Sequence, residues 1–247
     1  CYYERPRTDY EDPGLTQARQ HFEKAIELDS TLSDAHAYLA FFGFAHLVQR
    51  ITKDVDKTLD EMLAHGRKAE ALNSENPLAL LGISIAHFFR GKHPAALDHA
   101  QRALQFNPSF ALSHYWIGLA QVHSGEYQQG ESSALKTLEL SPADPDLSHF
   151  LGLLYFASLG QGKYEEALEA IEKALLRDPD AGHHLGFHTA VLGHLQRPES
   201  KTTLERYLAL RPNLKTRDDY RSIFVPNSTL ADPIIEGLIK AGWNPED

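Results

Sequence analysis

Apolar side chains recur three or four residues apart over most of the chain, and short polar segments rich in Gly, Pro, Asn or Asp interrupt the pattern. Ala167, Ile171 and Ala174 follow this spacing within one such block. Side chains spaced in this way lie on one face of an α-helix. The pattern therefore predicts a succession of amphipathic helices and an all-α fold.

One helix ending returns along the chain with nearly the same residues. Similar endings occur at residues 22–30, 67–74, 101–108 and 171–179, with weaker copies that end at Pro142 and Pro212. They recur about every 34 residues, a period typical of a helical repeat. We attribute two longer intervals to an extended helix pair around residues 49–57 and to an insert at residues 158–162 between two helices.

Each repeat carries the signals of two helices joined by a tight turn. Gly91, Gly125 and Gly162 each follow a helical block, where a residue that tolerates positive φ can end the first helix. Gly118 and Gly152 lie within first helices, where the absence of a side chain lets the second helix approach closely. The sequence thus predicts helical hairpins stacked side by side.

Residues 162–179, Gly-Lys-Tyr-Glu-Glu-Ala-Leu-Glu-Ala-Ile-Glu-Lys-Ala-Leu-Leu-Arg-Asp-Pro, contain nearly every residue of the second helix of a tetratricopeptide repeat. Over roughly residues 13–212 the chain resembles tetratricopeptide repeat (TPR) proteins. The resemblance implies a right-handed TPR superhelix, an α-solenoid of about five helical hairpins. We assign residues 1–12 to the remnant of an upstream helix and turn, 13–212 to the solenoid, and 213–247 to a C-terminal extension with a capping helix.

The capping helix is predicted from one more amphipathic segment, residues 232–243. The end of a solenoid needs an element that covers its apolar face and is polar outside. The predicted capping residues are Ile234, Ile235, Leu238, Ile239 and Trp243. In an alternative interpretation, this tail fills the concave groove of the solenoid from within.

Both ends of the chain resemble a narrower group. The segments Tyr-Glu-Asp-Pro-Gly near the start, Tyr-Arg-Ser-Ile-Phe at residues 220–224, and residues 232–243 are similar to TPR regions that follow bacterial class III adenylate cyclase or winged-helix regulator domains. This resemblance implies a regulatory segment of a longer bacterial signalling protein, located in the cytoplasm. An upstream signal peptide stays open as an alternative, because the chain begins within an element.

In a TPR solenoid the first helices line the concave surface. The residues on their predicted exposed stripe are Phe41, Phe44, Leu81, Ile85, Phe88, Phe89, Tyr115, Leu119, Val122, His149, Leu153 and Phe156. This partner groove lacks the Lys and Arg with which chaperone-tail receptors of the family hold a terminal carboxylate. An apolar groove favours an amphipathic helix or an extended hydrophobic peptide as its ligand.

We therefore expect a non-catalytic scaffold that binds a protein or peptide segment, or another domain of the same chain, and that is compatible with homo-oligomers. One alternative is an assembly scaffold of an envelope, pilus or secretion complex. The other is an accessory domain that docks on a cyclase-like catalytic domain of the same longer chain.

Composition narrows the candidate functions further. Lys and Arg number 24 against 34 Asp and Glu, and the net charge of −10 disfavours nucleic acid as a ligand. The apolar runs are too short for a membrane span. A single Cys rules out a zinc site made of several thiolates. His184 and His188 are one helical turn apart, next to His183, but a His-x-x-x-His pair without an intervening Glu or a nearby Cys predicts no metal site. We also expect no cofactor and no enzymatic activity.

Overall fold

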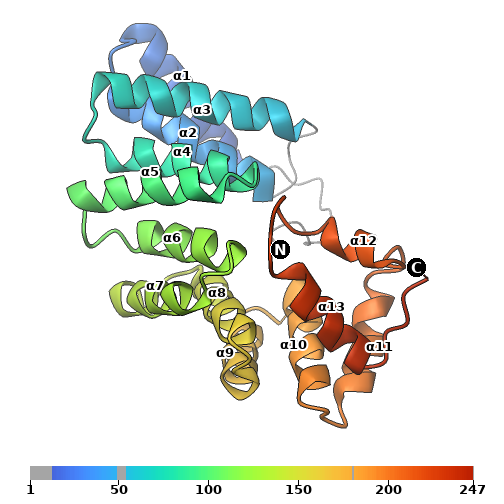
Figure 1. The fold of residues 1–247 in the computed structure, drawn as a ribbon. Helices are drawn as coiled ribbons and strands as arrows, with labels where there is room; N and C mark the ends of the chain where they lie inside the picture. The colour runs from blue at the N-terminus through green and yellow to red at the C-terminus, as the bar shows by residue number, and fades with distance from the viewer. Residues whose placement is uncertain (1–12, 49–53, 180, 247) are drawn as a thin grey trace. The chain divides into compact units, whose positions relative to one another are not determined.

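The computed structural model describes residues 13–48, 54–179 and 181–246, which form thirteen α-helices and no β-strand (Figure 1). The helices are α1 Pro13–Leu28, α2 Ser33–Val48, α3 Val55–Leu72, α4 Pro77–Phe89, α5 His93–Phe106, α6 Ala111–His123, α7 Tyr127–Leu140, α8 Leu147–Gly160, α9 Tyr164–Arg177, α10 Gly182–His194, α11 Ser200–Ala209, α12 Arg217–Arg221 and α13 Ala231–Lys240. The upstream element predicted at residues 1–12 lies outside the described residues.

Helices α2 to α11 form consecutive hairpins, each with a first helix of even number and a second helix of odd number. The chain divides into an N-terminal unit, which ends at Ile117, and a C-terminal unit, which begins at Gly118. The division falls within α6. Each unit is therefore a stack of hairpins with a core of its own.

In the N-terminal unit, α2 packs on α3 and α4, and α4 packs on α5. Gly82 of α4 lies against Ala40 of α2, so that a Cβ at this position would be 2.8 Å from the Ala40 Cβ. The buried Asn76 caps α4, because its side chain accepts hydrogen bonds from the amides of Leu78 and Ala79. Its amide group also donates to Asp34 at 2.8 Å, which joins the start of α4 to the start of α2.

In the C-terminal unit, α8 packs on α7 and α9, and α10 packs on α9, α11 and α13. The buried Tyr155 hydroxyl of α8 donates to the carbonyl of Phe187 in α10 at 3.1 Å, and the two rings stack with centroids 5.2 Å apart. This pair joins the first helices of two successive hairpins.

The predicted glycine turns are confirmed. Gly91, Gly125 and Gly162 follow α4, α6 and α8 with φ of 66°, 86° and 72°, the left-handed conformation in which a Cβ is unfavourable. Gln196 takes the same conformation after α10, with φ of 54°. The last hairpin therefore reproduces the turn without a glycine.

The insert predicted at residues 158–162 is wrong. Helix α8 continues to Gly160, and the turn that follows it matches the other hairpin turns. The additional residues lie instead in the connection before α8, residues 141–146, and in α8 itself, which has 14 residues where α6 has 13. Pro142 and Pro145 fall in this connection, and proline disfavours a helical conformation in the residue before it.

Candidate protein-binding face

The first helices of the hairpins are nearly free of charge. Helices α2, α4, α6, α8 and α10 contain no Lys, Arg or Glu, and Asp34 at the start of α2 is their single Asp. Charged residues lie mainly on the second helices and turns, as in α9, where Glu165 and Glu166 occupy the first turn. Any surface made by the first helices therefore has almost no permanent charge.

Aromatic rings of the N-terminal unit form one interlocked cluster. Phe44 of α2 meets Trp116 of α6 edge to face at 5.1 Å, and Phe88 of α4 meets the same indole at 5.4 Å. Phe89 and Tyr115 complete the cluster, with ring centroids 6.1 and 5.7 Å from Trp116. Edge-to-face pairs of this kind stabilise a surface beyond the area that they bury.

Within this unit the structure places most predicted groove residues inside the core. Phe41 and Phe44 are partly exposed, whereas the other five are buried. The buried residues are Leu81, Ile85, Phe88, Phe89 and Tyr115. A helix that is apolar on all sides packs against neighbouring helices on all sides. These neighbours cover the side chains that the sequence predicted to face a groove.

The same holds in the C-terminal unit. Leu119, Val122, Leu153 and Phe156 are buried, and His149 is partly exposed. Phe156 packs edge to face on Phe187 at 5.0 Å. None of the four apolar side chains is thus open to a partner as the chain stands.

A segment of the chain's C-terminal tail packs on the end of α6. We define the strap as residues 222–230, which connect α12 to α13. The Thr229 amide donates to the carbonyl of His123 at 3.1 Å, and the Thr229 hydroxyl donates to the carbonyl of Val122 at 3.2 Å. The Phe224 ring lies 6.4 Å from the His123 ring, which is itself 6.2 Å from Phe156. The strap therefore covers the end of α6.

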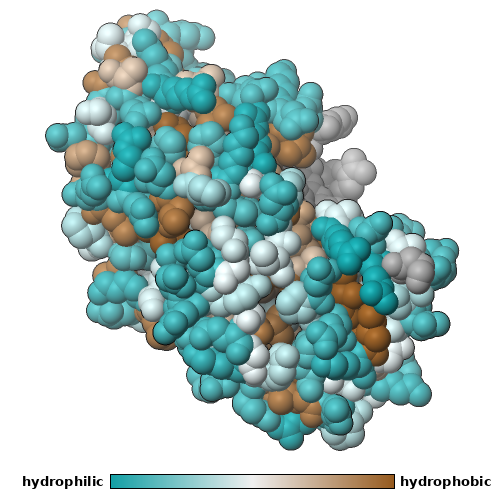
Figure 2. Space-filling model, in the orientation of Figure 1, coloured by the Kyte–Doolittle hydropathy of each residue, from teal (hydrophilic) through white to brown (hydrophobic). Residues whose placement is uncertain are grey.

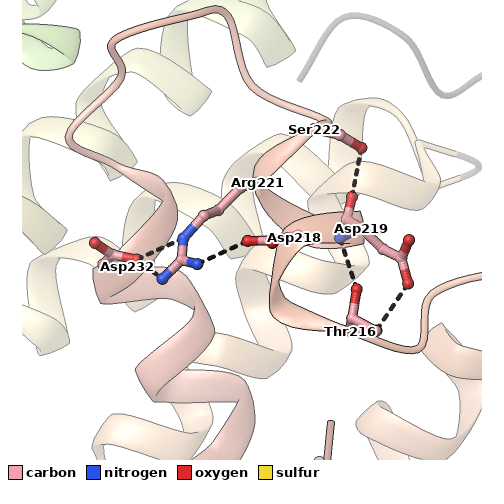
Figure 3. Close-up of polar contacts among 6 residues, drawn as sticks. All are labelled: Thr216, Asp218, Asp219, Arg221, Ser222 and Asp232. Carbon is pink, nitrogen blue, oxygen red and sulfur yellow. Dashed lines mark hydrogen bonds and ion pairs between the residues drawn. The ribbon is translucent and has the colours of Figure 1, made fainter. Parts of the chain in front are cut away.

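An ion pair closes the base of the strap (Figure 3). Arg221 donates to Asp232 at 2.9 and 3.1 Å, and also to Asp218 at 2.9 Å. Helix α12 begins with a capping box, in which the Thr216 hydroxyl accepts from the amide of Asp219 and the Asp219 carboxylate accepts from the amide of Thr216. The residues on both sides of the strap are thus held by local contacts.

The five predicted capping residues lie in or just after α13. Ile234, Ile235, Leu238 and Trp243 are buried, whereas Ile239 is partly exposed, and Figure 2 shows a hydrophobic strip where α13 lies. Helix α13 packs on α10, and the Trp243 ring lies 6.1 Å from that of Tyr220. The sequence patterns did not single out Gly193 and Gly237, which meet at the crossing of α10 and α13.

In the histidine cluster, His184 is buried, whereas His183 and His188 are partly exposed. The rings of His183 and His184 lie 4.2 Å apart, and His149 stacks on His183 at 6.2 Å. Burial lowers the pKa of His184 to about 4 and holds the pKa of His183 well below its usual value. Within the described ranges, no group of three or more His, Cys, Asp or Glu side chains is arranged to hold a metal ion.

A helix able to cross a membrane is also missing from the part of the chain that the structure describes. The described helices are either too short or too polar to span the hydrocarbon core.

Known proteins agree with this architecture. Residues 81–145 and 147–181 match models of the tetratricopeptide repeat, so these parts of the chain are TPR repeats. No curated protein sequence is significantly similar to the chain. The resemblance of the chain ends to cyclase-linked or winged-helix-linked TPR regions stays a prediction.

Several solved structures share the fold. A chain of the APC/C hetero-tetramer Cut9–Hcn1 matches 93% of this chain with a TM-score of 0.69 and 17% identity, and this chain spans 40% of that chain. A tetratricopeptide repeat protein from Parabacteroides merdae matches 94% with a TM-score of 0.57 and 17% identity, over 88% of its own length. YrrB, a TPR protein with an unusual peptide-binding site, matches 78% with a TM-score of 0.54 and 18% identity, over 93% of its length. The predicted fold class, an all-α TPR solenoid, is confirmed.

Proposed function

We propose that this chain is a non-catalytic scaffold whose first helices bind a segment of a partner protein through apolar contacts. The observation that carries the proposal is the lack of Lys, Arg and Glu in α2, α4, α6, α8 and α10. A face without Lys or Arg lacks the permanent cations that hold a terminal carboxylate or an acidic peptide, whereas it suits an apolar helix or extended segment. The peptide-binding site named for the fold neighbour YrrB supports a peptide as the ligand.

Phe41 and Phe44 are the proposed anchors in the N-terminal unit. Both side chains are partly exposed, and their ring centroids lie 6.2 Å apart on α2. Phe44 rests on Trp116, so the rigid aromatic cluster holds it in place. Full burial of an exposed Phe side chain contributes about 1.5–3 kcal/mol, and these partly exposed rings gain a fraction of that when a partner covers them.

Affinity capture from the native source, followed by mass spectrometry, tests the proposal. Phe41→Asp places a charge on the uncharged face and should remove the captured partner without loss of helicity. Leu176→Asp is the matched control, because Leu176 is 82% exposed on α9, a second helix. Capture of the same partners by both variants would argue against binding at Phe41.

Three narrower roles belong to this proposal. The first is regulation within a bacterial signalling protein of the cytoplasm, next to a cyclase-like or winged-helix domain. The others are assembly of an envelope complex and docking on a catalytic domain of the same chain. The net charge of −10 supports protein rather than nucleic acid as the ligand in each case. Sequence upstream of Cys1 distinguishes the roles, since each requires a different neighbouring domain or a signal peptide.

A further inference from the structure

We propose that the strap is an intramolecular ligand, and that the surface beneath it binds a partner segment of the same chemistry. That segment has an aromatic residue, a turn like that at Pro226 and Asn227, a Ser or Thr five positions after the aromatic residue, and then an aliphatic residue, as in Phe224, Thr229 and Leu230. The inference rests on the proposed scaffold function. It adds a second binding site to the scaffold and names the class of ligand that this site would bind.

The first argument concerns the backbone of the site. The last carbonyls of a helix have no partner within the helix, and they accept hydrogen bonds from other groups. At the end of α6, the carbonyl of His123 accepts from the amide of Thr229. Every residue except proline carries a backbone amide, so another polypeptide can replace this contact.

The second argument concerns the hydroxyl of Thr229. Its Oγ1 donates to the carbonyl of Val122 at 3.2 Å and accepts from the hydroxyl of Tyr127 at 3.0 Å. Only a side chain that both donates and accepts satisfies the two groups, which selects Ser or Thr over Val. Thr229 is exposed, so that water competes for these bonds and they hold the strap weakly.

Apolar side chains anchor the strap at both ends. Phe224 and Leu230 are buried, and the Phe224 ring lies against His123. Between them, Pro226 and Asn227 are exposed. The strap thus binds like a short peptide, through spaced anchors and a backbone contact, rather than as part of a continuous core.

The strap can leave without dismantling its flanks. Arg221 and Asp232 keep its two ends together, and α13 packs separately on α10. A pocket of about 670 Å³, which Asp218, Ala231 and strap residues line, opens beside the strap. Closed loops of this kind are self-contained surface elements.

A labelled peptide with the sequence of residues 222–231 tests the inference by fluorescence anisotropy. In the strap-replaced variant, residues 223–230 become a Gly-Ser linker of equal length, while Arg221 and Asp232 remain. We expect the peptide to bind this variant at least about tenfold more tightly than the wild type, because a site occupied by its own chain is rarely free. The same peptide with Thr229→Val should bind more weakly.

Absence of binding to a strap-replaced variant that keeps the wild-type circular dichroism spectrum would overturn the inference, as would equal binding to variant and wild type. Should that variant not fold, full-length Thr229→Val loosens the strap with one change and should bind the unmodified peptide more tightly than the wild type does. Thr202→Val, at an exposed Thr of α11, is its matched control and should behave like the wild type.

Two further results separate this inference from the scaffold proposal. A captured partner that binds the wild type and the strap-replaced variant equally, yet is lost in Phe41→Asp, would overturn the strap inference and support the scaffold. A wild-type dimer that dissociates on strap replacement would show that the strap occupies a second copy, which contradicts an intramolecular ligand.

Discussion

The Nδ1 atoms of His36 and His65 lie 3.0 Å apart and join α2 to α3. At this distance one ring nitrogen donates and the other accepts, so at least one of the two rings must be neutral. Burial lowers the pKa of both imidazoles below the usual value of 6.5. Protonation of both rings would bring two donors together and repel the two helices.

This pair predicts that acid destabilises the N-terminal unit. Because both pKa values are lower in the folded chain, the unfolded chain binds more protons as pH falls below about 6.5. The stability contributed by the pair is complete above that pH and is lost toward the folded pKa values. Melting temperatures at pH 8 and pH 5 should therefore differ less in His65→Gln, which does not titrate, than in the wild type.

His21→Gln is the control for this experiment, because His21 is exposed on α1. Its melting temperature should change with pH as much as that of the wild type. An unchanged difference in His65→Gln would assign the acid sensitivity to other histidines.

The crossing of α10 and α13 gives a second prediction. A Cβ on Gly237 would collide with the carbonyl of Ala190, and a Cβ on Gly193 would collide with the carbonyl of Gly237. Backbone atoms cannot move aside as a flexible side chain can, so Gly237→Ala should push the helices apart and cost about 1–3 kcal/mol. Urea denaturation measures this loss. Glu236→Ala, at an exposed position of α13, should be nearly neutral, and equal effects of the two changes would contradict the close crossing.

The sequence predicted the hairpins because their signals are local. Gly162 stands at a helix end and takes a positive φ, so its position alone indicates the turn. The insert predicted at residues 158–162 placed Gly160 between two helices, although α8 includes it. There the Tyr127 ring packs where a side chain would lie, so packing rather than a turn explains that glycine.

The candidate site was less predictable than the fold. Helical spacing shows that Ile85 and Phe89 lie on the same face of their helix. When a helix is apolar on all sides, however, the spacing does not show whether other helices cover that face. The contact of Thr229 with His123 joins residues far apart in the sequence, and no local pattern signals it. Trp116 was missed because the predicted stripe ran through its neighbour Tyr115, although both rings belong to one cluster.

The turns provide a matched pair of substitutions. Gly162 has φ of 72°, and no neighbouring atom lies within 4 Å of the place that a Cβ would occupy, so Gly162→Ala tests the backbone conformation alone and should cost about 1 kcal/mol. Gln196 already has φ of 54°, so Gln196→Gly should relieve the same strain, offset in part by the entropy of glycine in the unfolded chain. Chemical denaturation that finds Gly162→Ala as stable as the wild type would contradict a strained turn.

Removal of α13 tests the capping role proposed for the C-terminal extension. A chain that ends after Leu230 loses the buried side chains of Ile234 and Leu238 and exposes the face of α10 that they cover. An uncovered solenoid end is apolar and tends to associate with a second one. We therefore expect a lower melting temperature and self-association, measured by light scattering coupled to gel filtration. A chain that ends after Trp243 is the control, because it keeps α13 and loses the backbone bond from Glu246 to Lys215. If the shorter chain stays monomeric and melts like this control, α13 is not the cap, and the solenoid end is stable with α10 and α11 alone.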